Sequence, residues 1–315
     1  MTEKYDPYHE ARMIMDSMQG KVCLVTGATA GIGEVTALEL ARMGATVVGI
    51  GRSAEKCQAV AGRIRQQTGN PDVTFLVADL SSLAETRRVV AAFKAHYPRL
   101  DVLVNNAGAY YSKFQESADG IELTIALNFL SPFLLTHLLL DLLKASAPAR
   151  IINVSSNAHQ MAGINFDDIE GRRRYGGWTA YSQSKLGNIL FTHELAARLD
   201  GSGVTVNVLH PGFVATNFGR NNDGLIGYGT QIVQKLVAIS PEKGAQTQIY
   251  LATSPDVANV SGQYFVKSKP ATSSGASHDA AAAKRLWAWA EQMVEPYQEV
   301  NEVLPYIPNT VLQAV

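Results

Sequence analysis

Short apolar runs alternate with longer helical patterns along most of this 315-residue chain. The runs expected to be strands are residues 22–25, 46–50, 73–77, 102–104, 150–154, 204–209 and 263–266. Helical patterns cover residues 32–43, 54–67, 83–96, 121–143, 180–199 and 280–294. Apolar strands separated by helices predict βαβ units, in which helices cover both faces of a parallel sheet.

The predicted fold class is therefore α/β, a single doubly wound domain with a seven-stranded parallel sheet flanked by helices. Length alone allows about two domains. However, no linker rich in Pro, Gly or Ser divides residues 21–266, which favours one domain.

Composition removes several classes of function. The net charge is −1, so no basic field indicates a nucleic-acid partner. The two cysteines, Cys23 and Cys57, suit a reducing compartment, and no histidine pair has metal-site spacing. The most apolar run, 129–143, is interrupted by polar residues and is shorter than the ~20 residues that a bilayer needs. We therefore expect a cytoplasmic protein with no metal and no membrane span.

A glycine-rich turn follows the first strand and leads directly into a helix. Residues 26–33 read Thr-Gly-Ala-Thr-Ala-Gly-Ile-Gly, a spacing that is neither GxGxxG nor a Walker A loop. Such a turn brings backbone N–H groups and a helix N-terminus close to a pyrophosphate. The candidate cofactor residues here are Gly27, Thr29, Ala30, Gly31, Ile32 and Gly33.

The end of the second strand indicates which dinucleotide binds. A NAD-binding fold usually carries an acid about 20 residues past the glycines, but Arg52 stands 52 − 33 = 19 residues after Gly33. A guanidinium can pair bidentately with a 2′-phosphate. The sequence therefore favours NADP(H) over NAD(H).

Tyr181 and Lys185 are four residues apart on a predicted helix and so share one face. A nearby ammonium favours a phenolate, so we expect Lys185 to lower the pKa of Tyr181 toward the range of a useful acid/base. Ser156 follows the fifth strand, where ligands of open α/β sheets bind, and its hydroxyl can bond a substrate oxygen. His159, just beyond it, is a candidate substrate contact.

Together these motifs resemble the short-chain dehydrogenase/reductase family, whose members have a Rossmann-type fold. The matching pieces occur in the family's order: residues 26–33, Asp79-Leu80, 105–108, Asn128, Ser155-Ser156, 181–185 and Pro211-Gly212. Within the family, residues 128–135, 154–159, 181–191 and 283–287 resemble the retinol-dehydrogenase-like branch.

The resemblance implies roles for individual residues. Tyr181 is the general acid/base, Lys185 lowers its pKa and bonds the nicotinamide ribose, Ser156 holds the substrate oxygen, and Asn128 anchors a water. The remaining implied cofactor contacts are Asp79, Leu80, Asn106, Ala107, Gly108, Pro211, Gly212, Val214 and Thr216. Ala30 departs from NADP-preferring members that carry a basic residue there, so Arg52 alone supports that preference.

The resemblance also divides the chain. We expect an N-terminal extension (1–20), a dinucleotide-binding and catalytic domain (21–268) and a C-terminal extension with a helix (269–315). The gap between Ser156 and Tyr181, 181 − 156 = 25 residues, is about twice the family's usual one. The extra segment, about 162–177, resembles an insertion that could line the substrate entrance. A mobile substrate segment is expected at about 213–240.

The implied function is an NADP(H)-dependent oxidoreductase that interconverts an apolar aldehyde or ketone and its alcohol by hydride transfer. Two alternatives stay open: a C=C reductase resembling protochlorophyllide reductase, which light dependence would distinguish from a carbonyl reductase, and a non-catalytic NADP(H) sensor. The partner is a small carbonyl or alcohol molecule, and the resemblance allows a homo-oligomer.

Overall fold

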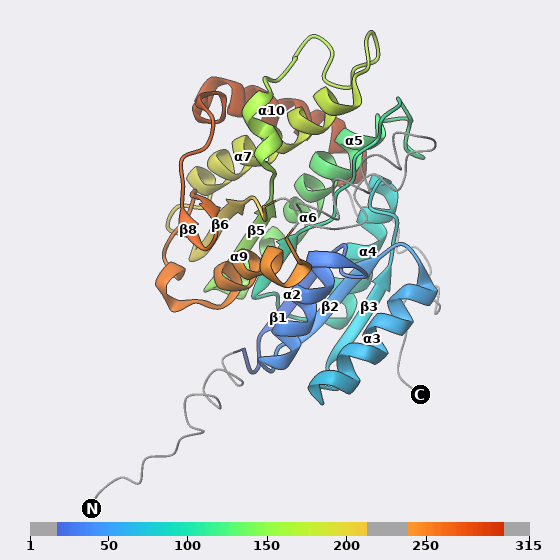
Figure 1. The fold of residues 1–315 in the computed structure, drawn as a ribbon, viewed down its shortest axis with the longest axis vertical. Coiled ribbons are helices and arrows are strands. Elements are labelled where there is room, and N and C mark those ends of the chain that lie inside the picture. Colours follow the sequence, from blue (N-terminus) through green and yellow to red (C-terminus); the bar gives the residue numbers. More distant parts are fainter. Residues whose placement is uncertain (1–17, 213–238, 299–315) are drawn as a thin grey trace, which may run out of the picture.

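One sheet runs through the computed structural model, which describes residues 18–212 and 239–298. Its strand order is β3-β2-β1-β4-β5-β6-β7-β8 (Figure 1). The strands are β1 (Val22–Thr26), β2 (Thr46–Gly51), β3 (Val73–Val77), β4 (Val102–Asn105), β5 (Ala149–Val154), β6 (Val204–Leu209), β7 (Tyr264–Val266) and β8 (Lys269–Pro270). β1 to β7 are parallel, which confirms the predicted fold class.

The sheet differs from the prediction in one respect. β8 adds an eighth strand, antiparallel to β7, beyond the last strand expected from the sequence. Lys267 and Ser268 adopt positive φ values of 50° and 59° and turn the chain back on itself. β8 is only two residues long, too short for a periodic pattern to reveal it.

Helices cover both faces of the sheet (Figure 1). The long helices are α2 (Gly31–Arg42), α3 (Ala54–Thr68), α4 (Leu83–His96), α6 (Ser131–Ala145), α7 (Gly177–Arg198), α9 (Pro241–Thr253) and α10 (Ala280–Val294). The short helical turns are α5 (Leu123–Ile125), η1 (Ala126–Leu130), η2 (Asn157–Met161), η3 (Pro255–Val257), η4 (Gly275–His278) and η5 (Glu295–Tyr297).

Two apolar cores lie on opposite faces of the sheet. Leu24 belongs to the core formed with α4, α6, α7 and α10, whereas its neighbour Val25 belongs to the core formed with α2, α3 and α9. Successive strand side chains point to opposite faces. A strand buried on both faces must therefore be apolar throughout, which is why β1 reads as an uninterrupted apolar run.

Helix α9 was absent from the sequence-based expectations. Its start carries recognisable signals: Ser240 accepts a hydrogen bond from the Lys243 N–H, Pro241 occupies the first turn, and Glu242 adds a negative charge near the helix N-terminus. The segment before this helix has an irregular composition, which obscured those signals.

The most apolar helical run lies inside the fold. Leu123–Ala145 has the length and composition of a membrane span, with a mean hydropathy of 1.8, but 72% of that window is buried in the structure. Phe129, Phe133 and Leu134 from this run belong to the core beneath α4 and α7. Among the described residues, this run is therefore accounted for as a core helix.

Several expectations lie outside the described residues. These are most of the segment at 213–240, including Val214 and Thr216, and most of the N-terminal extension. The last part of the C-terminal extension, 299–315, lies outside as well.

Candidate active site

The candidate site lies at the carboxyl ends of β1, β4, β5 and β6. The sheet order reverses between β1 and β4, and such a switch point is where open α/β sheets bind ligands. The glycine turn follows β1 and the serine pair follows β5, so β4 lies between the two motifs.

The two serines after β5 have different roles. Ser155 is buried, and its hydroxyl donates to the Lys185 carbonyl at 2.7 Å, so it joins β5 to α7. Ser156 is half-buried, and its Oγ accepts from the Ala158 N–H at 3.2 Å. It also hydrogen-bonds the Tyr181 side chain. Ser156 is therefore the serine that faces the predicted acid/base, as expected.

Tyr181 and Lys185 both point into this buried region. Burial raises the pKa of Tyr181 to about 12, and the hydrogen bond from Ser156 opposes that rise. Lys185 Nζ donates to the Val154 carbonyl at 3.0 Å and lies 5.7 Å from the centre of the Tyr181 ring. Burial lowers the pKa of Lys185 to about 8.

We expected Lys185 to lower the pKa of Tyr181, but the structure gives a different result. The shifts in the pKa of Tyr181 come from burial and from Ser156. Desolvation disfavours the phenolate and the ammonium alike. In this structure, Tyr181 is therefore a protonated phenol at neutral pH.

Asn128 sits in η1, a π-helical turn between α5 and α6. It is fully buried, and its Oδ1 accepts from the Ala109 N–H at 2.8 Å. Its Nδ2 donates to the Ala109 carbonyl at 2.9 Å and to the Ser184 hydroxyl at 3.1 Å. Isolated π turns frequently occur at functional sites. Asn128 thus links the loop after β4 to the helix that carries Tyr181 and Lys185.

Gly108 allows three segments to meet. A Cβ at this position would lie 3.1 Å from Lys185 Nζ and 3.2 Å from Asn128 Oδ1. Contacts this short would require the two side chains to shift, so Gly108 lets the loop after β4 pass close to them without displacing either.

The glycine turn after β1 fits a pyrophosphate. Gly27 and Gly31 have φ values of 64° and 60°, which favour glycine. Helix α2 begins at Gly31, and no side chain of the described residues caps it at Ala30. Its first N–H groups can therefore bind an anion. Because a dinucleotide cofactor carries such an anion, this turn would hold its pyrophosphate.

Asn106 and Ala107 hold this turn in place. Both backbone N–H groups donate to Thr26 Oγ1 at 2.9 Å, and Asn106 Nδ2 donates to the Thr26 carbonyl at 2.8 Å. The Asn106 side chain, an implied cofactor contact, is therefore engaged by the protein itself.

Arg52 and Asp79 line a cavity of about 380 Å³ together with Ser81 and Tyr111. Asp79 Oδ1 accepts from the Ser81 N–H at 3.0 Å and its hydroxyl at 2.7 Å, so the carboxylate is held within its own turn. The next residue, Leu80, is buried.

Across the site, Pro211 and Gly212 follow β6, with φ 90° at Gly212.

Gln248 of α9 is a residue that the sequence analysis missed. Its Nε2 donates to Asn106 Oδ1 at 3.3 Å, and its Oε1 accepts from the Thr36 hydroxyl at 3.4 Å. It supports Asn106 from 142 residues away in the chain, so no local motif indicates it.

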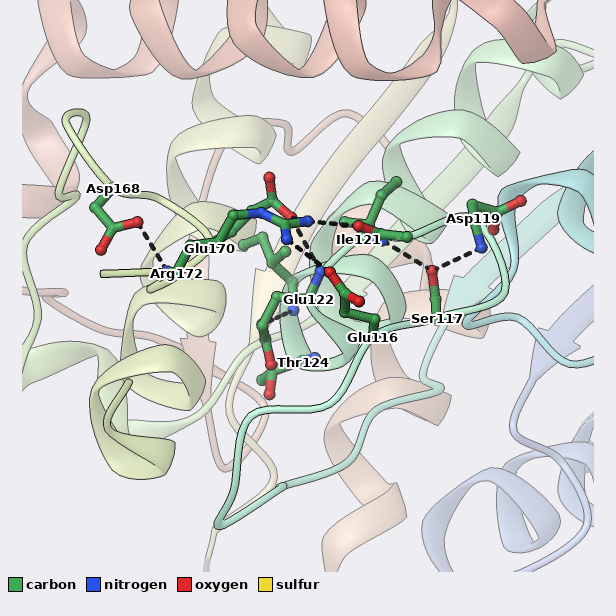
Figure 2. A network of polar contacts seen from close by, with 11 residues as sticks. Glu116, Ser117, Asp119, Ile121, Glu122, Thr124, Asp168, Glu170 and Arg172 are labelled. Atoms are coloured by element: carbon green, nitrogen blue, oxygen red, sulfur yellow. Dashed lines mark hydrogen bonds and ion pairs between the residues drawn. The ribbon is translucent and has the colours of Figure 1, made fainter. Parts of the chain in front are cut away.

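The insertion at 162–177 binds the segment before α5 (Figure 2). Arg172 pairs with Glu116 at 2.6 Å and with Glu170 at 2.8 Å, while Glu170 accepts from the Glu122 N–H at 3.1 Å. Ser117 accepts from the Asp119 N–H in the same network. Because Glu116 and Ser117 also line the Arg52 cavity, the insertion supports that cavity's outer wall.

Tyr175 makes the deeper contacts of this insertion. Its hydroxyl lies 3.1 Å from both Glu122 Oε1 and Thr124 Oγ1 and 3.0 Å from the Tyr111 carbonyl. Glu122 is buried and accepts from the Thr124 and Ile125 N–H groups at the start of α5. The insertion is therefore joined to the helical run that carries Asn128.

The histidine near the serine pair is not a substrate contact. His159 is fully buried, and both of its ring nitrogens contact protein atoms. In the part of the chain that the structure describes, no group of three or more His, Cys, Asp or Glu side chains could hold a metal ion.

Comparisons with known proteins agree with this geometry. A family model described as short chain dehydrogenase matches residues 21–224. Retinol dehydrogenase 14 of Mus musculus is 44% identical over 289 residues, covering 88% of this chain and 86% of the relative. Retinol dehydrogenase 13 of Homo sapiens is 44% identical over 283 residues, with coverages of 88% and 86%.

Solved structures give the same result. A crystal structure of an uncharacterised protein from Mycobacterium paratuberculosis aligns with a TM-score of 0.72 and 32% identity, covering 90% of this chain and 97% of that one. The Pseudomonas aeruginosa RhlG/NADP active-site complex aligns with a TM-score of 0.63 and 32% identity, with coverages of 80% and 96%.

The chain therefore belongs to the short-chain dehydrogenase family. Within that family it is an NAD(P)-dependent oxidoreductase acting on CH–OH and C=O groups, similar to the retinol dehydrogenases.

Proposed function

We propose that this protein is an NADP(H)-dependent carbonyl reductase or alcohol dehydrogenase for an apolar aldehyde or ketone, with Tyr181 as its general acid/base. The observation that carries the proposal is the meeting of Ser156, Tyr181 and Lys185 at the carboxyl edge of the sheet. Ser156 hydrogen-bonds Tyr181, and Lys185 lies beneath the Tyr181 ring. A non-catalytic sensor has no need of such a proton relay.

Each of these side chains has a distinct part in the proposed mechanism. Ser156 orients the substrate oxygen beside Tyr181, and Tyr181 gives its phenolic proton to that oxygen during reduction or takes the proton back during oxidation. Lys185, whose Nζ lies 5.7 Å from the centre of the Tyr181 ring, would hold the nicotinamide ribose of a bound cofactor beside that ring. A bound nicotinamide cofactor would supply or accept the hydride.

The protonation state of Tyr181 favours reduction near neutral pH. Burial raises the pKa of Tyr181 to about 12, so the phenol holds the proton that reduction requires. Alcohol oxidation needs the phenolate and should therefore become faster as the pH rises.

An apolar substrate is supported by the aromatic surroundings of Tyr181. The rings of Tyr110 and Trp178 lie 6.2 Å and 5.8 Å from the Tyr181 ring, and 6.2 Å from each other. Trp178 is 49% exposed, and Met161 at the end of η2 is 69% exposed. Exposed apolar side chains beside a polar reaction centre suit a hydrophobic substrate. The alcohol in the names of the retinol dehydrogenases is of this class.

The preference for NADP(H) rests on Arg52. This residue lines the cavity beyond β2, where a guanidinium can pair with a 2′-phosphate. A structural relative is described as an NADP active-site complex, which agrees with this preference.

A fluorescence titration of NADPH and NADH against wild type and Arg52→Asp tests the cofactor preference. Arg65→Asp, in the last turn of helix α3 and outside the cavity lining, makes the same change in net charge and serves as the control. We expect Arg52→Asp to weaken NADPH binding at least about tenfold, since a charge-assisted hydrogen bond contributes ~1.5–3 kcal/mol. NADH binding should change little. Equal affinity of the wild type for NADPH and NADH would contradict the proposal that Arg52 selects NADP(H).

Turnover is then followed by the loss of NADPH absorbance with retinal, decanal and acetophenone, in darkness and in light. Oxidation of NADPH by one of these in darkness supports the carbonyl reductase. Activity that needs light and a C=C substrate would favour the ring reductase, and binding without any turnover would favour the sensor.

A further inference from the structure

His159 is a buried titratable residue that the proposed mechanism does not use. It lies three residues after Ser156 in the 3-10 turn η2 and is 0% exposed. Its ring packs against Tyr264 of β7 at 5.2 Å. A polar ring buried this completely requires partners for both of its nitrogens.

Both partners are present, and they determine which nitrogen carries the proton. His159 Nδ1 lies 2.7 Å from the Ser156 carbonyl oxygen, and Nε2 lies 3.1 Å from the backbone nitrogen of Ser274. A carbonyl can only accept and an amide N–H can only donate. Nδ1 must therefore carry the proton and Nε2 must be bare, which makes the ring neutral. Burial lowers the pKa of His159, in agreement with a neutral ring.

We infer that His159 is a positioning residue for the catalytic serine. It joins the turn at Ser156 to the segment after β8, through an ordered chain of hydrogen bonds from Ser274 to His159 to Ser156. The inference rests on the proposed function only in taking Ser156 and Tyr181 as the catalytic pair.

The Ser156 turn depends on this contact because it lies beyond the end of the sheet. β5 ends at Val154, so no strand pairing holds Ser156. Among the described residues, its carbonyl accepts from His159 alone, through the backbone N–H at 3.1 Å and the ring at 2.7 Å. The same turn aligns the Ala158 N–H with Ser156 Oγ. Loss of the ring contact would loosen the direction in which Ser156 meets Tyr181.

Two substitutions separate the contacts of the ring. In His159→Asn the amide nitrogen can take the place of Nδ1 and donate to Ser156, but nothing reaches Ser274. In His159→Gln the longer side chain can place its oxygen near Nε2 and accept from Ser274, but the side-chain donor to Ser156 is lost and the backbone N–H remains. Both variants remove the titratable ring, so they are matched controls for each other.

The contact with Ser156 should matter more to turnover. With NADPH and the aldehyde reduced best by wild type, we expect His159→Gln to lower kcat at least about tenfold, as misplacement of a reacting group does. His159→Asn should keep kcat within about threefold of wild type. The Kd for NADPH should be unchanged in both. Equal loss of kcat in the two variants, or a matching loss of NADPH affinity, would overturn the inference.

Substitutions at Ser274 test the other hydrogen bond of His159 and leave the sequence of η2 unchanged. Ser274 has φ −64°, close to the value proline requires, so Ser274→Pro keeps this φ while it removes the N–H donor together with the side-chain hydroxyl. Ser274→Ala keeps that donor and removes a buried hydroxyl that has no partner among the described residues. We expect Ser274→Pro to lower kcat about threefold to tenfold and Ser274→Ala to leave it within about twofold. If the two variants behave alike, His159 is not oriented from Ser274.

A measurement that needs no turnover separates this inference from the proposed function. In ¹⁵N-labelled wild type at pH 7, the His159 ring should carry its proton on Nδ1, and Ser274→Pro should disturb that state. A ring protonated on Nε2, or on both nitrogens, contradicts the inference even if the enzyme is active. A wild type that binds NADPH but reduces no carbonyl contradicts the proposed function, whatever the His159 tautomer.

Discussion

Helices α3 and α7 cover opposite faces of the same sheet but are built from different side chains. The residues that α3 buries are Cys57, Val60, Ala61 and Ile64, an apolar stripe at helical spacing. Helix α7 buries polar residues as well, namely Ser182, Gln183, Ser184, Lys185, Asn188 and Thr192. One helix therefore serves the core alone, whereas the other brings reactive groups into it.

The difference has an energetic consequence. Most buried polar groups of α7 find partners, as when the Ser184 hydroxyl donates to the Tyr181 carbonyl at 2.7 Å and Thr192 accepts from Asn153 at 2.9 Å. These bonds offset desolvation but add little net stability. Helix α3 thus contributes apolar burial alone, whereas α7 contributes apolar burial through residues such as Leu190 and Phe191 and also holds Lys185 and Tyr181 away from water.

The largest expected effect comes from Tyr181→Phe. Removing the proposed proton donor should lower kcat about 10²- to 10⁴-fold, the usual contribution of general acid/base catalysis. NADPH binding and thermal stability should be retained, because the phenyl ring keeps its packing. Steady-state kinetics and a cofactor titration measure both effects, with Tyr250→Phe of α9 as the control. Near-normal kcat in Tyr181→Phe would show that Tyr181 of α7 is not the proton donor.

Ile64→Ala tests the α3 side of the comparison. Ile64 is 1% exposed in an apolar core, so truncation should lower the free energy of unfolding by about 2–5 kcal/mol. Denaturant unfolding measures this loss, and Ile64→Val should cost only ~0.5–1.5 kcal/mol. The kcat of the folded fraction should stay at the wild-type value. A large loss of kcat would show that α3 also shapes the site.

Lys185→Met should change the free energy of unfolding less than Ile64→Ala does, and it should raise that free energy rather than lower it. Burial lowers the pKa of Lys185 from 10.5 to about 8, so the folded protein releases a proton that the unfolded chain keeps between these values. Stability therefore rises with pH across that window, and the full cost of the buried ammonium is present below it. Met, which keeps the shape, should raise the free energy of unfolding at pH 7 by about 1–3 kcal/mol.

One structural observation and one pH measurement check that the buried ammonium of Lys185 lowers stability. The Val154 carbonyl still accepts from Asn188 at 3.3 Å, so the substitution leaves no orphaned acceptor. The rise in stability between pH 8 and 10.5, the two pKa values of Lys185, should disappear in Lys185→Met, and turnover should be lost. A variant that is less stable at pH 7 would show that α7 contributes stability through this residue.

Local sequence patterns were enough to predict most of the sheet. Each parallel strand is a short apolar run because it is buried on both faces, and each helix between strands shows its own period. The first βα turn could be placed for the same reason, since Gly27 and Gly31 need positive φ values that few other residues adopt.

Long-range partners could not be predicted in this way. Gln248 reaches Asn106, and Tyr175 reaches Glu122, only because the fold brings distant segments together. The pKa of Tyr181 was misjudged for a related reason. Helical spacing shows that Lys185 shares a face with Tyr181, but it does not show how completely the fold buries both side chains.

The π-helical turn at Asn128 determines the angular positions, around the helix axis, of the side chains of α6 that follow it. A turn wound with one extra residue shifts the angular position of later side chains by about 100° relative to an unbroken α-helix. Asn128 faces Ala109 and Ser184, while Phe133, five residues later, packs against Phe191 and Trp287. Deleting a single residue between them would rotate one set out of place. The length of this helical run is therefore constrained as strictly as the identity of any residue in the site.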